Sequence, residues 1–110
     1  MDVKEWEIRV HRLLRQAGLS RTHRGYGYLV YSMELAREEP ERLKLPTKGI
    51  YPAVARAFHT TPSGVDGGLR TAARLCRTRC PGLYRGGDGP EISVKSFLQA
   101  VYRAACLPDG

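Results

Sequence analysis

The sequence predicts an all-α fold, a compact domain of five or six helices, and three observations support this. Apolar residues recur at helical spacing in five stretches of the chain. No stretch shows a convincing alternation of apolar and polar residues, which a half-buried strand would require. Glycine, proline, serine or threonine stands between the stretches, where helices start and stop. With 110 residues, the chain fits one domain over residues 1–110.

The N-terminal part predicts two helices joined by a short basic connection. The first covers residues 6–17, and Gly18 stands where a C-terminal cap is expected. Residues 20–24 connect it to a second helix over residues 25–38, which the acids around Pro40 end. The apolar positions of the first helix are Trp6, Ile8, Val10, Leu13, Leu14 and Ala17. In the second, the tyrosines are expected to pack in the core, with stacking on bases as the alternative; these are Tyr26, Tyr28 and Tyr31.

Two helices in the middle of the chain predict a helix-turn-helix unit. The first is expected from Thr47 to Phe58, with Pro52 in its first turn. After a tight connection, Thr61 serves as the N-cap of a second helix over residues 62–79. The apolar residues expected to pack between the two helices are Ile50, Val54 and Phe58 with Val65, Leu69 and Ala72.

The last thirty residues predict a loop and a final helix. Glycines and prolines between residues 80 and 90 indicate the loop. Its run Gly86-Gly87-Asp88-Gly89 lacks the lysine and the following hydroxyl of a phosphate-binding loop. Ser93 is the expected N-cap of a helix that ends near Cys106. The apolar surface of this helix consists of Phe97, Leu98, Val101 and Tyr102.

The charge balance favours a polyanionic partner. The chain has 18 basic against 11 acidic residues, a formal net charge of +7, and fourteen of the basic residues are arginine. Neutralising phosphates releases condensed counterions, and arginine offers planar bidentate donors for phosphates and guanine edges. On the second helix of the pair, no acid lies between Asp66 and Asp88, and the basic run is Arg70, Arg74, Arg77 and Arg79. A basic protein without such a partner is the alternative.

The sequence contains no convincing pattern of catalytic or metal-binding residues, and we expect no catalytic site, no cofactor and no metal. The three cysteines are odd in number and lack paired spacing, which argues against a disulfide framework or a zinc site. They are expected to be core or surface thiols: Cys76, Cys80 and Cys106. The three histidines, His11, His23 and His59, have no acidic or nucleophilic companion at useful spacing. They are expected on the surface, and His59 could make a minor phosphate contact.

The chain also lacks the marks of export or membrane insertion. Its first seven residues carry acids and no apolar segment, and no apolar run approaches the ~20 residues that a membrane span needs. We therefore expect a cytoplasmic protein with reduced thiols and no membrane partner.

Two segments resemble a known family. Residues 50–65, Ile-Tyr-Pro-Ala-Val-Ala-Arg-Ala-Phe-His-Thr-Thr-Pro-Ser-Gly-Val, are similar to the helix-turn-helix of the C-terminal effector domain of the sporulation initiation response regulator, the sporulation stage-zero protein A family. The family pattern there is Leu-Tyr-Pro-x-Ile-Ala-x-x-Phe-x-Thr-Thr-x-Ser-x-Val. Residues 24–29, Arg-Gly-Tyr-Gly-Tyr-Leu, resemble its Lys-Gly-Tyr-x-Tyr-Leu segment. The similarity is good over residues 8–79 and loose beyond.

The resemblance implies a six-helix effector domain whose recognition helix enters the major groove of double-stranded DNA. In the family this domain follows a phosphorylated receiver domain, and DNA binding depends on dimerisation. No receiver stands in these 110 residues, so control by phosphorylation is not expected of them. The side chains expected to face the groove or its phosphates are Arg70, Arg74 and Ser63. Those expected to anchor the DNA backbone are Thr60, Thr61, Lys48 and, in a flanking contact, Arg24.

The recognition helix also departs from the family pattern. The family continues as Ser-Arg-Val-Glu-Arg-Ala-Ile-Arg, and its two early arginines with the glutamate face the bases. Here Gly64 and Gly67 replace the arginines, Asp66 replaces the glutamate, and Arg70 is retained. Each lost bidentate arginine–guanine contact removes ~1–3 kcal/mol of discrimination. Either the bare backbone approaches DNA or a partner closely, or the reading surface has decayed on a retained scaffold. In both cases the chain is not expected to read the family's operator sequence.

The sequence leaves different functions open. The first is a DNA-binding transcriptional regulator with altered or weakened sequence readout. The second is a protein-interaction module on the same scaffold, which forms a homodimer or pairs with a full-length regulator through the last helix. Nonspecific nucleic-acid binding through charge alone is a third.

Overall fold

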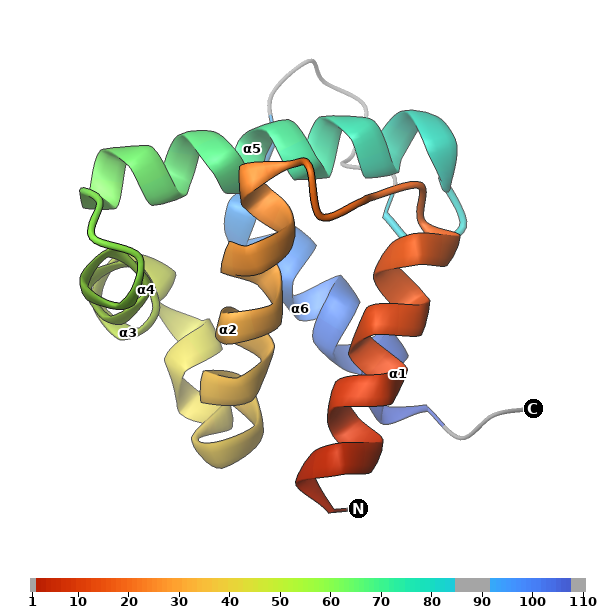
Figure 1. The fold of residues 1–110 in the computed structure, drawn as a ribbon, viewed down its shortest axis with the longest axis horizontal. Helices are drawn as coiled ribbons and strands as arrows, with labels where there is room; N and C mark the ends of the chain where they lie inside the picture. Colours follow the sequence, from red (N-terminus) through yellow and green to blue (C-terminus); the bar gives the residue numbers. More distant parts are fainter. Residues whose placement is uncertain (1, 85–91, 108–110) are drawn as a thin grey trace.

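The structure, a computed structural model, describes residues 2–84 and 92–107, and every regular element in these two ranges is helical (Figure 1). The predicted all-α class is therefore confirmed. The elements are α1 (Val3–Gln16), α2 (Arg24–Glu38), the 3-10 helix η1 (Pro40–Lys44), α3 (Pro46–Gly49), α4 (Tyr51–Ala57), α5 (Pro62–Arg79) and α6 (Val94–Cys106). The predicted glycine-rich loop at residues 86–89 lies outside the described residues.

The long helix α5 lies across the ends of α1 and α2, with α3 and α4 near its N-terminal end (Figure 1). It packs against α2, α4 and α6. Within the described residues, these neighbours lie on one side of α5, and the helix is exposed on the other side at Ser63, Gly67, Thr71 and Arg74.

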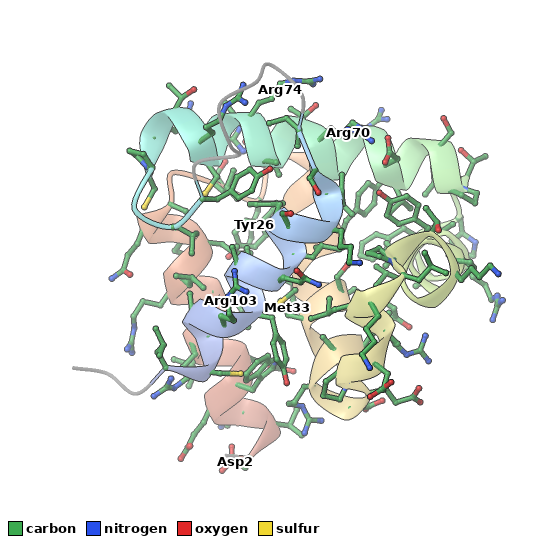
Figure 2. All side chains as sticks on the ribbon, turned by 180° about the vertical axis from the view of Figure 1, so that it is seen from behind. Asp2, Tyr26, Met33, Arg70, Arg74 and Arg103 are labelled. Carbon is green, nitrogen blue, oxygen red and sulfur yellow. The ribbon has the colours of Figure 1, made fainter. Side chains whose placement is uncertain are left out.

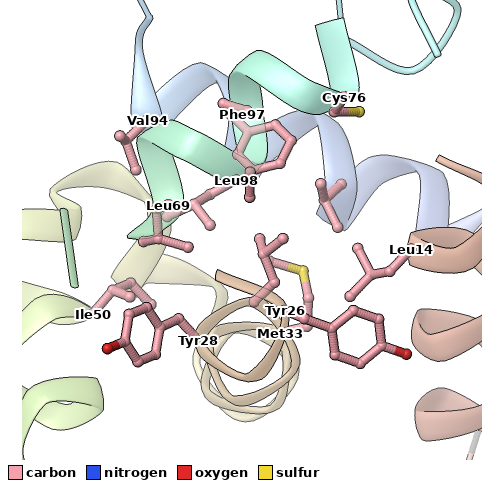
Figure 3. Packing of buried hydrophobic residues seen from close by; sticks show 14 of the residues in the cluster. Leu14, Tyr26, Tyr28, Met33, Ile50, Leu69, Cys76, Val94, Phe97 and Leu98 are labelled. Carbon is pink, nitrogen blue, oxygen red and sulfur yellow. The ribbon is translucent and has the colours of Figure 1, made fainter. Parts of the chain in front are cut away.

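Four helices supply most of the core (Figure 3). Leu14 of α1, Met33 of α2, Leu69 of α5 and Phe97 of α6 are all fully buried. Tyr26 and Tyr28 are buried as predicted, whereas Tyr31 is only half-buried.

The prediction that the last helix presents an apolar surface is wrong. Phe97, Leu98 and Val101 are fully buried inside the domain, and Tyr102 is half-buried. The same spacing that suggested a partner surface instead supplies the core face of α6, which packs on α1, α2 and α5.

Several helix ends follow the predicted local chemistry. The Thr61 side chain accepts a hydrogen bond from the Gly64 N–H at 3.0 Å, and the Ser93 side chain accepts one from the Ser96 N–H at 3.2 Å. Gly18 follows the end of α1 with φ of 87°, a conformation that favours glycine. The first helix begins earlier than predicted, because Asp2 caps it by accepting from the Glu5 N–H at 2.8 Å.

The first helix of the helix-turn-helix unit was predicted as one helix from Thr47 to Phe58, and this is wrong. The chain forms α3, breaks at Ile50 (φ −116°, ψ −54°) and restarts as α4. Pro52 explains the break, because it has no N–H to bond the Lys48 carbonyl and its ring would clash with that carbonyl. In the first turn of α4 the same proline is tolerated.

Two apolar residues are also more exposed than predicted. Phe58 was expected to pack against α5, but it is 42% exposed, because α4 ends at Ala57 and the ring turns towards α2. There it meets Tyr28 edge-on, with 5.2 Å between the ring centroids, and Tyr31 at 6.0 Å. Ile8 on α1 is 51% exposed.

Candidate nucleic-acid interface

The exposed face of α5 is the centre of the candidate interface. Four of its exposed residues recur at spacings of three and four, which places them on one side of the helix: Ser63, Gly67, Thr71 and Arg74. The opposite side is buried and consists of Val65, Leu69, Ala72, Ala73 and Cys76. We call the four exposed residues the α5 face. Figure 2 shows Arg74 on this helix, at the edge of the molecule.

The three glycines of α5 stand in three different surroundings. A Cβ at Gly67 would meet nothing within 4 Å, so this glycine leaves the backbone bare towards solvent. A Cβ at Gly64 would lie 2.6 Å from the Thr60 hydroxyl oxygen. A Cβ at Gly68 would lie 2.6 Å from the Tyr28 ring, so Gly68 serves helix packing. Of the two positions where the family pattern has arginine, only Gly67 is open.

The start of α2 lies directly against α5. A Cβ at Gly25 would lie 2.4 Å from the Gly68 carbonyl oxygen and 2.9 Å from the Ala72 Cβ. Glycine at both positions permits this close crossing. The crossing places the exposed Arg24 beside the α5 face.

A groove of about 550 Å³ follows this crossing. One wall contains Thr22, His23 and Arg24, and the other contains Gly64, Gly67 and Thr71. It continues past His23 and Arg24 into a second hollow of about 400 Å³, which Arg21, Phe58 and Thr60 also line. Within the described part of the chain, none of the residues that line these two hollows is acidic. We call the two together the basic groove.

Asp66 and Arg70 take part in a hydrogen-bond network inside the domain. The Tyr51 hydroxyl donates to Asp66 Oδ1 at 2.6 Å, and Arg70 Nε donates to Asp66 Oδ2 at 2.7 Å. Arg70 Nη1 also donates to the Ile92 carbonyl oxygen at 2.6 Å. The network ties α5 to α4 and to the segment before α6. Both side chains were predicted to face DNA, but these bonds engage them with the domain itself.

Other arginines also bond to the domain's own carbonyl groups. Arg79 donates to the Gly18 carbonyl, and Arg42 donates to the Gly49 carbonyl at 2.6 Å. The predicted basic run on α5 is therefore divided: Arg70 and the exposed Arg79 bond to carbonyl groups of other segments, whereas Arg74 stands on the α5 face.

The remaining predicted residues lie near the start of α5 or on α3. Thr61 is the N-cap of α5, and Thr60 lines the basic groove. Lys48 lies exposed on α3 and lines neither hollow of the groove.

Sequence reasoning missed several residues that the structure brings together. Thr71 could have been found, since it completes the spacing of the α5 face. Thr22 and His23 could not, because the crossing of α2 over α5 places them there. The Ser20 N–H donates to His23 Nδ1 at 3.2 Å, so the neutral ring carries its proton on Nε2.

His11 was expected on the surface, but it is half-buried on α1. Its Nδ1 lies 2.6 Å from the Tyr26 hydroxyl oxygen. Burial lowers the pKa of His11, and the nearby charges of Arg21 and Arg15 lower it further.

The network around Asp66 predicts a specific dependence of stability on pH. Burial alone would raise the pKa of Asp66, but hydrogen bonds from Tyr51 and Arg70 and the Arg70 charge outweigh it, so the pKa lies below its ordinary value. The unfolded chain therefore binds the proton more readily. The contribution of Asp66 to the free energy of unfolding is full above the ordinary aspartate pKa of about 4 and is lost as the pH falls through the folded value.

Urea denaturation at several pH values between about 6 and 2 tests this expectation. The Asp66→Asn variant keeps an acceptor for Tyr51 but cannot titrate, so its stability should fall less steeply below about pH 4 than that of the parent chain. Identical pH profiles for the two proteins would contradict the network's role.

The three cysteines lie at different depths in the domain. Cys76 is buried, Cys80 half-buried and Cys106 exposed, and all three are free thiols. Burial raises the pKa of the Cys76 thiol to about 11, with a smaller contribution from Cys80, so Cys76 is protonated at neutral pH. Across residues 2–84 and 92–107, no three histidine, cysteine, aspartate or glutamate side chains gather as a metal site would require. None of the described helices is both long and apolar enough to span a membrane.

The paired helices α4 and α5, the solvent-facing side of α5 and the basic groove beside it define a helix-turn-helix domain of the DNA-binding class. The sequence model of the family described as "Sporulation initiation factor Spo0A C terminal" matches residues 10–81, more than half of the chain. The chain belongs to this family, which consists of helical DNA-binding effector domains of a transcription factor and is not a class of enzymes. The resemblance found in the sequence is thus confirmed. No solved structure matches the chain.

Proposed function

We propose that this domain acts as a transcriptional regulator in which α5 enters the major groove of double-stranded DNA with an altered or weakened sequence readout. One observation carries the proposal: the bare, solvent-facing α5 face lies beside a basic groove whose described lining contains no acid. Such a surface suits a phosphate backbone, because positive side chains release counterions on contact.

The surroundings of each residue favour a division of roles. Ser63 and Arg74 on the α5 face contact the groove or its phosphates, and the bare backbone at Gly67 allows close approach. Along the basic groove, phosphate contacts come from Thr22, His23, Arg24 and Thr60, and Thr61 adds one from the N-cap of α5. Contacts of this kind position the protein without reading sequence.

Asp66 and Arg70 have a different role in this proposal. Their bonds to Tyr51 and the Ile92 carbonyl set the orientation of α5 on the domain. This leaves little direct base readout on the helix, and it supports binding that is tight at low salt and weakly selective.

Replacing Arg74 with alanine tests the proposal. The variant should bind the family's operator duplex and a scrambled duplex more weakly by the same factor, because a phosphate contact is lost from both. The slope of log K against log salt should shrink by about one. Fluorescence anisotropy at two salt concentrations measures both quantities.

Arg103→Ala is the matched control, since Arg103 is exposed on α6, away from α5 (Figure 2). It removes the same charge and should change the slope less. An unchanged slope for Arg74→Ala would count against the assigned face. If the parent chain binds neither duplex at low salt, the isolated domain is not a DNA reader, and a protein partner becomes the better hypothesis.

The alternative, a protein-interaction module that pairs through the last helix, receives no support from α6. Its large apolar side chains are buried in the domain, so pairing there would require the core to open. Homodimerisation is therefore not part of this proposal.

A further inference from the structure

A separate cavity of about 350 Å³ opens beside Phe58, outside the α5 face. Three aromatic rings line it, those of Tyr26, Tyr31 and Phe58. Polar groups stand among them: the carboxylate of Glu34, the guanidinium of Arg21 and the imidazole of His11. The volume falls in the range of about 300–1,000 Å³ that small-molecule sites occupy. We call it the aromatic cavity.

Phe58 leaves an apolar ring at the surface, because α4 ends at Ala57. Its ring is 42% exposed although it stands at the connection between α4 and α5, where an apolar contact was expected. The rings of Tyr28 and Tyr31 stand nearly perpendicular to it, with interplanar angles of 83° and 88°. A flat ligand that stacks on this ring would bury the exposed surface.

The aromatic cavity adjoins one end of the basic groove. The two hollows share Arg21, Gly27 and Phe58 as lining residues. Beyond this shared wall the groove adds Arg24 and His23. Gly27 keeps the wall thin, since a Cβ there would lie 3.1 Å from the Phe58 ring. An aromatic, carboxylate-bearing compartment thus leads into a basic compartment.

We propose that these two compartments together bind a guanine nucleotide, with the base in the aromatic cavity and the phosphate in the basic groove. Phe58, the exposed ring of the three, stacks on the base, as aromatic side chains do when they bind single-stranded nucleic acid. Arg21, Arg24 and the Nε2–H of His23 are the phosphate donors. The proposed nucleotide site and the proposed DNA interface share the phosphate donors of the basic groove. Their other residues differ.

Glu34 selects guanine over adenine. A carboxylate offers two acceptor oxygens, and the Watson–Crick edge of guanine presents two adjacent N–H donors, whereas adenine presents one donor and one acceptor. Glu34 also lies beside Glu7: burial raises the pKa of Glu34, and a hydrogen bond and the charge of Glu7 raise it further. Ligand N–H donors would relieve the repulsion between these neighbouring carboxylates.

Isothermal titration calorimetry on the full chain tests this proposal, with GMP, AMP, guanosine and inorganic phosphate as the probes. The affinity for GMP should be at least about tenfold higher than that for AMP, because only guanine makes the bidentate contact. Guanosine and phosphate should each bind more weakly than GMP, because each fills one compartment. No heat with GMP at millimolar concentration, or equal binding of GMP and phosphate, would overturn the proposal.

Three variants separate the contributions. Glu34→Gln should reduce GMP affinity to that of AMP, while Arg21→Ala should weaken both nucleotides by the same factor. Gly27→Ala should abolish nucleotide binding without lowering the melting temperature, since alanine favours the helix and meets only the end of the Phe58 ring. Arg103→Ala is again the control and should bind GMP as the parent does. A Glu34→Gln variant that still prefers GMP would refute the assigned base contact.

Titration with a guanine-containing single-stranded oligonucleotide distinguishes a free guanine nucleotide from a guanine base within a nucleic-acid strand. Tighter binding of the oligonucleotide than of GMP, with the same loss in Glu34→Gln, identifies a base within a strand as the ligand. Tighter binding of GMP identifies the free nucleotide. Duplex binding measured on Glu34→Gln should be unchanged, so failure of this inference is distinguishable from failure of the proposed DNA binding.

Discussion

Replacing Gly25 with alanine is expected to lower the free energy of unfolding by about 3 kcal/mol, the upper part of the range for overpacked sites. The new Cβ would lie 2.4 Å from the Gly68 carbonyl oxygen, a backbone atom that cannot rotate away. Relief requires α2 and α5 to separate where they cross. Since a domain of this size is stable by only about 5–15 kcal/mol, this loss is a large fraction of the total.

Gly67→Ala is the matched comparison for this experiment. It is the same chemical change on α5, but its Cβ meets nothing within 4 Å. It should therefore raise the free energy of unfolding by up to about 1 kcal/mol, the helix-propensity difference between glycine and alanine. Urea denaturation of the parent and both variants measures the two changes. Equal effects of Gly25→Ala and Gly67→Ala would contradict the close crossing.

Much of the fold could be predicted because its signals are local. A glycine after α1 and hydroxyl residues before α5 and α6 act on neighbouring backbone groups, so Gly18, Thr61 and Ser93 indicated the helix ends correctly. The break at Ile50 was missed although its cause is local too. Pro52 removes a hydrogen bond to a residue four positions earlier, so the expected helix from Thr47 placed the proline too far from its start.

The site was predicted less well, because its geometry depends on contacts between distant segments. The pairing of Tyr51 with Asp66 and that of Arg70 with the Ile92 carbonyl cross between elements, and no spacing in the sequence encodes them. A run of arginines indicates positive charge but not which guanidinium groups bond to the domain's own carbonyls. Phe58 shows the same limit: its helical spacing matched a core position, whereas the end of α4 turned its ring outward.

The glycines of α5 show how the two levels of information combine. The sequence shows that Gly64 and Gly67 occupy positions where the family pattern has arginine. The structure shows that the two positions are not equivalent, because Thr60 crowds Gly64 and nothing crowds Gly67. Gly68, by contrast, is required for packing against Tyr28. A reading side chain could therefore return at Gly67 with little change to the domain.

Gly67→Arg is accordingly expected to strengthen duplex binding. The new guanidinium would stand on the α5 face between Ser63 and Arg74, and one added phosphate contact should steepen the slope of log K against log salt by about 0.9. If the side chain reaches a guanine edge, discrimination between the operator and a scrambled duplex should grow by ~1–3 kcal/mol. Anisotropy titrations against both duplexes at two salt concentrations separate these two effects.

Two further variants make the result decisive. Gly67→Glu places a charge of opposite sign at the same open position and should weaken binding to both duplexes. Gly64→Arg should gain less than Gly67→Arg, because its Cβ must displace the Thr60 hydroxyl, 2.6 Å away. If the arginine and the glutamate at position 67 change neither affinity nor salt slope, the α5 face does not contact DNA. The basic groove would then have to bind nucleic acid without the recognition helix, because its phosphate donors on the α2 side do not depend on that face.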